Sequence, residues 1–556
     1  MKRAICGEPG REFRSPDPAR NRLAVLLPLA VIGLLLVVRC IAVFRLQADS
    51  DESQHLHLIY GWLNGELPYR DRFDNHTPLL YLLFLPLAAL AGETPHIILL
   101  ARIAEFPISL AILVLIYLIG RRLTDRQVAL WTVATVLALA DWSLKSLEFR
   151  PDVLWSFCWF LAIWVLVKAP DNLNARRFFA AGLILGTALC FSIKTTFLAT
   201  AFALAWLVAW ALCEDLRRAL PPRSAGRCAL AAGAGFLIVP TVVFGWLISE
   251  GTSVGTLRFC LFEANRADFE PERVAWFFTL AVAVLWLAWK MATSGVRGAT
   301  LAVFLGAAIY MASLIGFSPE LRKQSLLPVY PILVLFAWQC AAQLLRRKTQ
   351  AINVAGLCVC ALASIHFLVE ARLWEDGLRD QRELLRDTLK LTQAGDYLID
   401  RKGETIFRRR PVYLVYQHAT VRAIEEGRLS DPDPEALSST ATAVAINESM
   451  GLTDQMRKFL RKNYVPVGDG RLRVAGRSLL FYEEAGHLAA RAPVMIPGQY
   501  VVVRNGNALQ ETRVEKPGWH DVDLGGQPGP ASLFWKPAWD AGFRPLNEID
   551  TQADGR

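Results

Sequence analysis

The feature that most constrains this chain is a series of apolar runs that fills its first 369 residues. Crossing a bilayer takes about 20 mostly apolar residues. Eleven runs meet or approach this length, namely Leu23–Leu46, Ile97–Ile119, Gln127–Ala140, Val153–Val167, Phe178–Ile193, Thr195–Cys213, Ala229–Ser249, Val274–Met291, Gly298–Phe317, Ser325–Leu345 and Ile352–Val369. A twelfth run, Pro78–Ala91, is short and contains Pro86. The series excludes a disordered chain and a disulfide scaffold and predicts an α-helical polytopic membrane protein.

Basic residues between the runs orient them, because lysine and arginine concentrate in cytoplasmic loops. Residues 1–22 contain six Lys and Arg, so we expect a cytoplasmic N-terminal tail in a cytoplasmic (inner) membrane protein. Later basic clusters are Arg121/Arg122/Arg126, Lys168/Arg176/Arg177, Arg217/Arg218/Arg223/Arg227, Lys290/Arg297 and Arg346/Arg347/Lys348. All of them become cytoplasmic if Pro78–Ala91 is re-entrant or interfacial and the chain makes about eleven crossings. If Pro78–Ala91 spans instead, Arg121 and Arg122 lie outside.

The formal net charge of +9 belongs to this membrane region. From Glu370 to Arg556 the chain has 26 basic and 27 acidic residues, so the excess lies between the apolar runs. Basic runs interleaved with aromatic residues, which are typical of nucleic-acid binding, do not occur. We therefore expect no nucleic-acid partner.

The first loop on the predicted outer face, 47–77, is rich in acids and histidines. Leu56, Ile59, Tyr60 and Leu63 follow a helical period and predict an amphipathic helix lying along the membrane surface. Asp49 and Glu52 have capping-box spacing at its start, and Gly65 suits its end.

Asp51 and His55, four residues apart on this helix, share one face. A carboxylate in the first turn is suited to act as a general base for a substrate at the membrane surface. The alternative is that Asp51 and Glu52 only cap and solvate the helix.

Three parts of the chain resemble motifs of the GT-C membrane glycosyltransferases, such as the protein O-mannosyltransferases and the lipid A aminoarabinose transferases. The first is the first loop, with the segments Asp51-Glu52, Gly65-Glu66-Leu67-Pro68-Tyr69-Arg70-Asp71 and Asp74-Asn75-His76-Thr77-Pro78-Leu79. Phe149-Arg150-Pro151-Asp152 is similar to the second acidic motif, and Arg322–Pro331 resembles a late Pro-rich segment. The resemblance covers about residues 20–370.

This resemblance implies transfer of a sugar from a polyprenyl phosphate to a lipid, polysaccharide or protein acceptor on the outer face of the membrane, with inversion. Asp51 would be the base, with Glu52 beside it and Asp152 as a second catalytic acid. We expect His55, Tyr69, Arg70 and Asp74 to bind substrate. His76 stands where the aminoarabinose transferases have a lysine for the donor phosphate, which leaves the sugar open.

Cations at the predicted outer face are candidates for holding the donor phosphate. Lys194 interrupts two apolar runs, and Arg322 and Lys323 precede a Pro-rich helix start. The alternatives are snorkelling for Lys194 and a salt-linked loop around Asp152. Nucleotide-binding loops and metalloprotease motifs are not found, so we expect no cofactor; a divalent metal stays possible.

After Glu370 the chain changes character. We expect a soluble outer region, with an α/β part at 370–470 and a β-rich, sandwich-like part at 471–556. Strands are predicted at Asp396–Asp400, Pro411–Tyr416, Ser478–Tyr482, Gly498–Arg504, Thr512–Val514 and Ala531–Trp535. The basic run Arg408-Arg409-Arg410 predicts a solvated face, with contact to an anionic lipid or glycan as the alternative.

The sequence therefore predicts a GT-C-type membrane domain over 23–369 and a glycosyltransferase activity. A transporter or lipid-sugar flippase is the alternative, but such proteins place ionisable residues near the bilayer midplane, often within internal repeats. A non-catalytic scaffold that displays the outer region is a third reading. Neither the sugar nor the acceptor follows from the sequence.

Overall fold

The computed structural model describes residues 18–168, 173–264, 271–317, 322–447, 451–484, 487–523 and 531–546. Most of the predicted N-terminal tail, residues 1–17, lies outside these ranges. The chain divides into two compact units. Unit 1 comprises Met1–Gln47, His76–Leu82 and Leu99–Leu378, and unit 2 comprises Ala48–Asn75, Leu83–Ile98 and Arg379–Arg556. The first loop thus belongs to the same unit as the C-terminal region.

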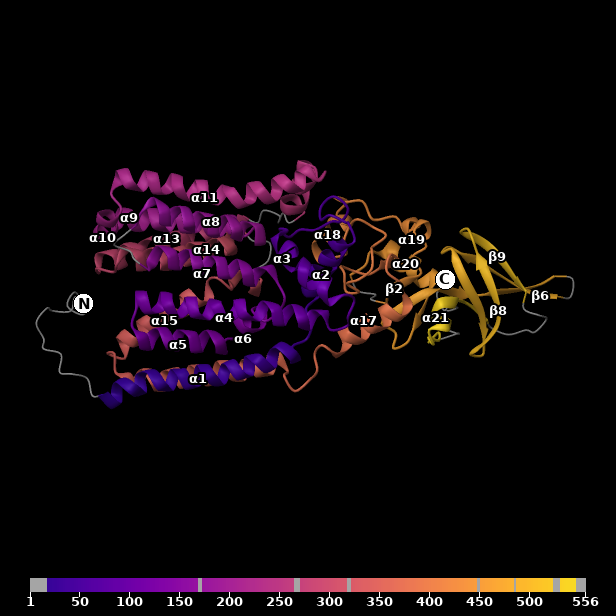
Figure 1. Ribbon diagram of the computed structural model, residues 1–556, viewed down its shortest axis with the longest axis horizontal. Coiled ribbons are helices and arrows are strands. Elements are labelled where there is room, and N and C mark those ends of the chain that lie inside the picture. The colour runs from indigo at the N-terminus through magenta and orange to yellow at the C-terminus, as the bar shows by residue number, and fades with distance from the viewer. Residues whose placement is uncertain are drawn as a thin grey trace, which may run out of the picture. The chain divides into compact units, whose positions relative to one another are not determined.

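Unit 1 is helical, and its long helices run side by side (Figure 1). They are α1 (Pro18–Arg45), α4 (Ile97–Leu123), α5 (Arg126–Ala138), α7 (Pro151–Val167), α8 (Ala175–Phe191), α9 (Thr195–Leu212), α11 (Pro222–Ser249), α13 (Pro271–Thr293), α14 (Gly298–Phe317), α15 (Tyr330–Leu344) and α16 (Thr349–Ala371). Short helices connect them: α6 (Ala140–Lys145), α10 (Glu214–Ala219), α12 (Val254–Arg258), η1 (Phe259–Glu263) and η2 (Lys323–Leu326). Each apolar run expected from the sequence coincides with a helix.

Seven helices among the described residues are long and apolar enough to cross a membrane. Their apolar side chains face outward to an extent that water would not favour: Leu34, Leu230, Val282 and Leu362 are each more than 60% exposed. This pattern is that of a multi-pass membrane protein, as predicted. The count of eleven crossings stays a prediction.

Helices α8 and α11 pack through glycine. A Cβ on Gly182 of α8 would lie only 2.0 Å from the carbonyl oxygen of Ala232 on α11. A Cβ on Gly186 would lie 2.2 Å from that of Phe236. From the other side, a Cβ on Gly235 would lie 2.3 Å from the oxygen of Phe179. Small residues let membrane helices approach closely, and this spacing of four is the usual arrangement.

Arg102 of α4, a buried arginine within an apolar helix, has a structural role. Its guanidinium donates to the carbonyl oxygens of Leu46 and Gln47 at 2.9 Å each, just beyond the end of α1. Carbonyls at a helix end lack intrahelical partners, and a cation there also complements the helix dipole.

The short apolar run at Pro78–Ala91 forms helix α3 (Leu79–Ala91). Thirteen residues rise about 20 Å, which is less than the bilayer core of about 30 Å. Its C-terminal part belongs to unit 2, where Tyr60 donates to the carbonyl oxygen of Gly92. The side chain of Leu90 is 89% exposed. The re-entrant or interfacial placement of this segment stays a prediction.

Unit 2 combines helices with two sheets. Its helices, besides the part of α3 that it contains, are α2 (Ser50–Leu63), α17 (Arg379–Leu391), α18 (His418–Glu425), α19 (Glu435–Ser439), α20 (Asp454–Asn463) and α21 (Lys536–Asp540). Its strands are β1 (Leu398–Ile399), β2 (Val444–Ile446), β3 (Tyr464–Val467), β4 (Leu472–Ser478), β5 (Leu480–Glu484), β6 (His487–Val494), β7 (Gly498–Arg504), β8 (Asn507–Val514), β9 (Gly518–Asp523) and β10 (Ser532–Trp535). One sheet has the order β1-β2-β4-β10-β7-β8, with β3 also paired to β4, and the other has the order β5-β6-β9.

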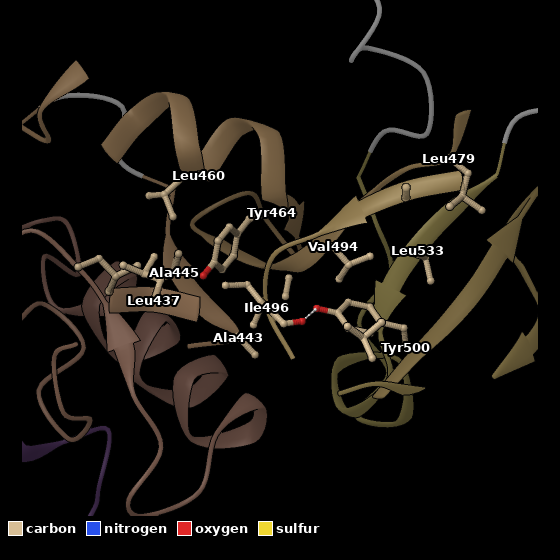
Figure 2. Close-up of a cluster of buried hydrophobic side chains, with 14 of the residues drawn as sticks. Leu437, Ala443, Ala445, Leu460, Tyr464, Leu479, Val494, Ile496, Tyr500 and Leu533 are labelled. Carbon is tan, nitrogen blue, oxygen red and sulfur yellow. Dashed lines mark hydrogen bonds between the residues drawn. The ribbon is translucent and has the colours of Figure 1, made fainter. Parts of the chain in front are cut away.

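The large sheet joins the two parts that the sequence suggests for the C-terminal region. Strand β4, which lies after residue 471, pairs antiparallel with β2 and β3, which lie before it. The hydrophobic core is continuous as well: Leu437 and Tyr464 belong to the same cluster as Tyr500 and Leu533 (Figure 2). Within that cluster the hydroxyl of Tyr500 donates to the carbonyl oxygen of Ile496 at 2.7 Å.

Strand β7 matches its predicted bounds, and Asn505-Gly506 forms the turn to β8 with positive φ at both residues. This is the turn chemistry that such a pair favours. The strand predicted at Pro411–Tyr416 is wrong. The backbone there bends, and the carbonyl oxygen of Tyr413 instead accepts from the backbone N–H of Phe73 at 3.0 Å. The backbone N–H of Tyr416 donates to the carbonyl oxygen of Arg401 at 2.7 Å, so this segment pairs with the first loop and with a turn rather than with a sheet.

Candidate functional site

Helix α2 begins with the predicted capping box. The Asp49 side chain accepts from the backbone N–H of Asp51, and the Glu52 carboxylate accepts from that of Asp49, at 2.9 Å each. Gly65, with a positive φ of 82°, follows the helix end, as predicted. The polar face of the predicted amphipathic helix is not exposed, because every residue from Glu52 to Gly61 is buried, and its position along the membrane surface stays a prediction. Other parts of unit 2 cover its polar face.

Asp51 forms an ion pair with Lys402, a residue of the C-terminal region 351 positions away. The Lys402 Nζ lies 2.5 Å from Asp51 Oδ1. The Asp51 side chain is 17% exposed and that of Lys402 only 11%. The carboxylate is therefore the more accessible member of this pair.

The turn that carries Lys402, residues 400–405, is organised around the buried carboxylate of Asp400. That carboxylate accepts from the backbone N–H groups of Gly403 and Thr405 at 3.0 Å each and from the Thr405 hydroxyl at 2.7 Å. The Arg410 Nε lies 3.1 Å from it. Burial alone would raise the pKa of Asp400, but the charge of Arg410 and the Thr405 hydrogen bonds lower it overall.

His57 of α2 lies against the same turn and is a neutral imidazole by its contacts. Its Nδ1 donates to the carbonyl oxygen of Ile406 at 3.0 Å, and its Nε2 accepts from Arg72 at 2.9 Å. Burial, reinforced by the charge of Arg72, holds the pKa of His57 well below its usual value. Arg72 also pairs with Glu66 of the first loop.

The predicted solvated face at Arg408–Arg410 is wrong. Arg408 and Arg410 are buried, and Arg408 pairs with Glu93 at 2.7 Å. Arg409 lies 3.6 Å from Glu66. Each guanidinium has a carboxylate neighbour, which is the usual condition for burying charge.

The predicted substrate-binding residues of the first loop differ in accessibility. His55, Tyr69 and Asp74 are buried. Tyr69 adopts a positive φ of 68°, rare for a bulky residue, and its carbonyl oxygen accepts from the hydroxyl of Tyr413 at 2.6 Å. Arg70 is exposed and pairs with Asp71 at 2.7 Å, which lowers the pKa of Asp71. Arg70 is thus the member of this set that faces solvent.

In unit 1, Asp152 lies in the first turn of α7 behind Pro151, as predicted. Its Oδ1 accepts from Lys194 Nζ at 2.8 Å, and its Oδ2 lies 3.4 Å from Arg150 Nε. His76 is close enough to interact electrostatically with it. The structure therefore brings three predicted site residues, Asp152, Lys194 and His76, into one cluster.

In the pair Asp152–Lys194 the lysine is the more exposed member, whereas in the pair Asp51–Lys402 it is the carboxylate. The Lys194 side chain is 31% exposed, whereas that of Asp152 is 6% exposed. Lys194 also lies 5.7 Å from the centre of the Trp155 ring, which is buried. Asp152 holds the ammonium group of Lys194, and the Lys194 side chain is still partly exposed.

Lys323 lies in a further set of contacts in unit 1. Its Nζ is 2.7 Å from Asp141 and 3.1 Å from Glu370, and Asp141 also accepts from the hydroxyl of Tyr330 at 3.1 Å. The neighbouring Arg322 is exposed. Among the described residues no group of three or more His, Cys, Asp or Glu side chains is arranged to hold a metal ion.

Comparison with known proteins gives a family-model match over part of the chain and a shared fold. Residues 75–246 match the family model described as dolichyl-phosphate-mannose-protein mannosyltransferase. No curated protein matches the chain in sequence.

Among solved structures, the chain is similar to ArnT from Cupriavidus metallidurans bound to undecaprenyl phosphate, with a TM-score of 0.52 and 15% identity over 80% of this chain and 97% of that one. The apo state of the same ArnT gives a TM-score of 0.53, with the same identity and coverage. These findings confirm the resemblance seen in the sequence motifs: the chain has the fold of a GT-C superfamily membrane glycosyltransferase.

Proposed function

We propose that this protein transfers a sugar from a polyprenyl-phosphate donor to an acceptor at the outer face of the membrane, with inversion at the anomeric carbon. The shared fold supports the class of donor, since the ArnT structure contains undecaprenyl phosphate. The observation that carries the proposal is that a carboxylate and an ammonium group are each held by an ion pair while still partly exposed. These are Asp51, at 17%, and Lys194, at 31%.

A single-displacement reaction needs both kinds of group. Asp51 takes the proton from the acceptor hydroxyl or phosphate as that oxygen bonds to the anomeric carbon. The bond from that carbon to the donor phosphate oxygen breaks, and its electron pair leaves with the phosphate. Lys194 stabilises the developing phosphate charge.

The other predicted site residues take supporting parts in this proposal. Lys323, with Arg322 directly before it in the sequence, adds positive charge for the phosphate, and His76 offers a ring N–H to it. Asp152 orients Lys194 by the 2.8 Å contact. Arg70 is available to contact substrate, whereas Glu52 holds the start of α2 and thereby the position of Asp51.

The test uses the purified full-length protein in liposomes with a panel of polyprenyl-phosphate hexoses and pentoses and extracted envelope lipids and glycans. The wild-type protein should release polyprenyl phosphate and form a glycosylated product detectable by mass spectrometry. Asp51→Asn should reduce transfer about 10²- to 10⁴-fold, the usual contribution of a general base. Transfer at the wild-type rate by Asp51→Asn would contradict the assignment. Movement of the donor lipid across the bilayer without product would favour a flippase.

A further inference from the structure

The C-terminal region contributes a residue to the candidate site. We propose that Lys402 is the positioning residue of Asp51, holding the carboxylate in the orientation from which it takes the acceptor proton. This inference rests on the proposed function, in which Asp51 is the base. It gives the C-terminal region a direct part in the reaction, through the position of the base.

The first support is the contact itself. Lys402 Nζ and Asp51 Oδ1 are 2.5 Å apart, and both side chains are more than four-fifths buried. Surface ion pairs contribute little because solvent screens them and their side chains stay mobile. A pair that is mostly buried fixes the geometry of both groups more firmly.

The second support is the construction of the turn that carries Lys402. The backbone N–H of Lys402 donates to Glu404 Oε2 at 2.9 Å. The neighbouring Gly403 has a φ of 110°, a conformation in which a residue with a side chain would be strained. A Cβ on Gly403 would come within 2.6 Å of the Cβ of His57 on α2. The turn therefore packs directly on the helix that begins with Asp51.

The third support is that the surrounding charges are satisfied by one another. Asp400 is matched by Arg410, Glu404 lies 3.2 Å from Arg401, and Arg72 is matched by Glu66. The ammonium group of Lys402 is directed at Asp51 from within this network. Reactive groups are most effective when neighbouring side chains restrict their position, since a displacement of about 1 Å can cost about 10²-fold in rate.

The experiment measures kcat and KM for the donor on full-length protein, using the donor that the wild-type protein turns over. Lys402→Met should lower kcat about 10- to 100-fold and leave KM within about 3-fold, because it misplaces the base without touching the donor. Lys402→Arg should recover at least part of this loss, since it keeps the cation. The matched control is Lys458→Met, at an exposed lysine of α20 in the same unit, with wild-type kinetics expected.

A double variant separates positioning from an independent role. If Lys402 acts through Asp51, adding Lys402→Met to Asp51→Asn should cost little beyond Asp51→Asn alone. Losses that multiply in the double variant would overturn the proposal. Lys402→Gln replaces Lys402→Met if thermal unfolding shows that the latter does not fold.

The outcomes distinguish this inference from the proposed function. Full activity of Lys402→Met together with an inactive Asp51→Asn overturns the role of Lys402 and leaves the proposed function intact. Full activity of Asp51→Asn overturns the proposed base and this inference with it.

Discussion

The pairs Asp51–Lys402 and Asp152–Lys194 contain the same two residue types in nearly the same geometry, yet they expose opposite members. In unit 2 the lysine is the more buried partner and comes from a charged turn of the C-terminal region. In unit 1 the carboxylate is the more buried partner, because it lies in the first turn of a packed helix. The comparison shows that the surroundings of an ion pair, rather than its composition, determine which group can meet a ligand.

The two surroundings also differ in how they accommodate charge. Around Asp51 the cations and carboxylates of unit 2 are buried in matched pairs, such as Arg410 with Asp400. Around Asp152 the apolar helices leave the cluster at a helix start, where Lys194 is partly exposed. The Asp51 region should therefore be sensitive to loss of buried partners and the Asp152 region to loss of an accessible cation.

The largest effect expected is from Asp400→Asn. It leaves the buried guanidinium of Arg410 without its anionic partner, which typically costs about 3–5 kcal/mol. Hydrogen exchange of residues 400–410 in the full-length protein should show a marked loss of protection. The control is Asp454→Asn, an exposed pair with Arg457, with an effect below about 1 kcal/mol. Equal effects of the two variants would contradict the buried network.

Lys194→Met should weaken donor binding by about 1.5–3 kcal/mol, or about 10- to 150-fold in the dissociation constant for undecaprenyl phosphate, because it removes a charged hydrogen bond. Lys402→Met should leave this constant unchanged. Binding can be followed by thermal shift with undecaprenyl phosphate in detergent. Lys168→Met, at the opposite end of α7 and exposed, is the control. The comparison fails if the Lys194 and Lys402 variants bind equally.

Gly186→Val tests the frame that positions α7 and α9 in unit 1. Its side chain would collide with the backbone of Phe236, and such overpacking typically costs about 1–3 kcal/mol. Thermal unfolding of the detergent-solubilised protein should report the loss. Gly233→Val on α11, where a Cβ meets open space, should be tolerated. If both variants are equally stable, the glycine contact does not support the helix pair.

The smallest effect concerns pH and unit 2. The pKa of His57 is lowered in the folded state, so the unfolded chain binds the extra proton first and stability falls as the pH drops below about 6.5. Between pH 7.5 and 5.0 the loss of stability should reach at most about 2 kcal/mol. Asp400 does not contribute to it, because its pKa is lowered and it titrates at a more acidic pH. His57→Gln should flatten this dependence. An unchanged slope in His57→Gln would show that another group is responsible.

Much of the fold follows from local signals. The apolar runs predict each membrane helix, and the capping box and Asn505-Gly506 predict a helix start and a hairpin, because these features depend on neighbouring residues. The strand predicted at Pro411–Tyr416 fails for the opposite reason. Its β-branched and aromatic residues favour a strand, but its backbone partners are Phe73 of the first loop and Arg401 of a turn.

The candidate site divides in the same way. Asp51, Asp152 and Lys194 are identifiable from the sequence, since an ionisable residue beside an apolar run or within a family motif is unusual in itself. Lys402, Asp400 and Arg410 carry no such signal, because a charged turn in a soluble region is ordinarily solvated. Only burial distinguishes them, and burial depends on chain segments hundreds of residues apart.

The sequence by itself determined that this is a multi-pass membrane protein with a GT-C resemblance and a set of candidate acids and cations. Hydrophobic length and local spacing carry that information within a few turns of chain. The tertiary structure alone decided that the first loop folds with the C-terminal region, that Asp51 meets Lys402, and which member of each pair is accessible. Long-range contacts set these features, because the energetic balance of a buried charge depends on whichever partners the fold brings to it.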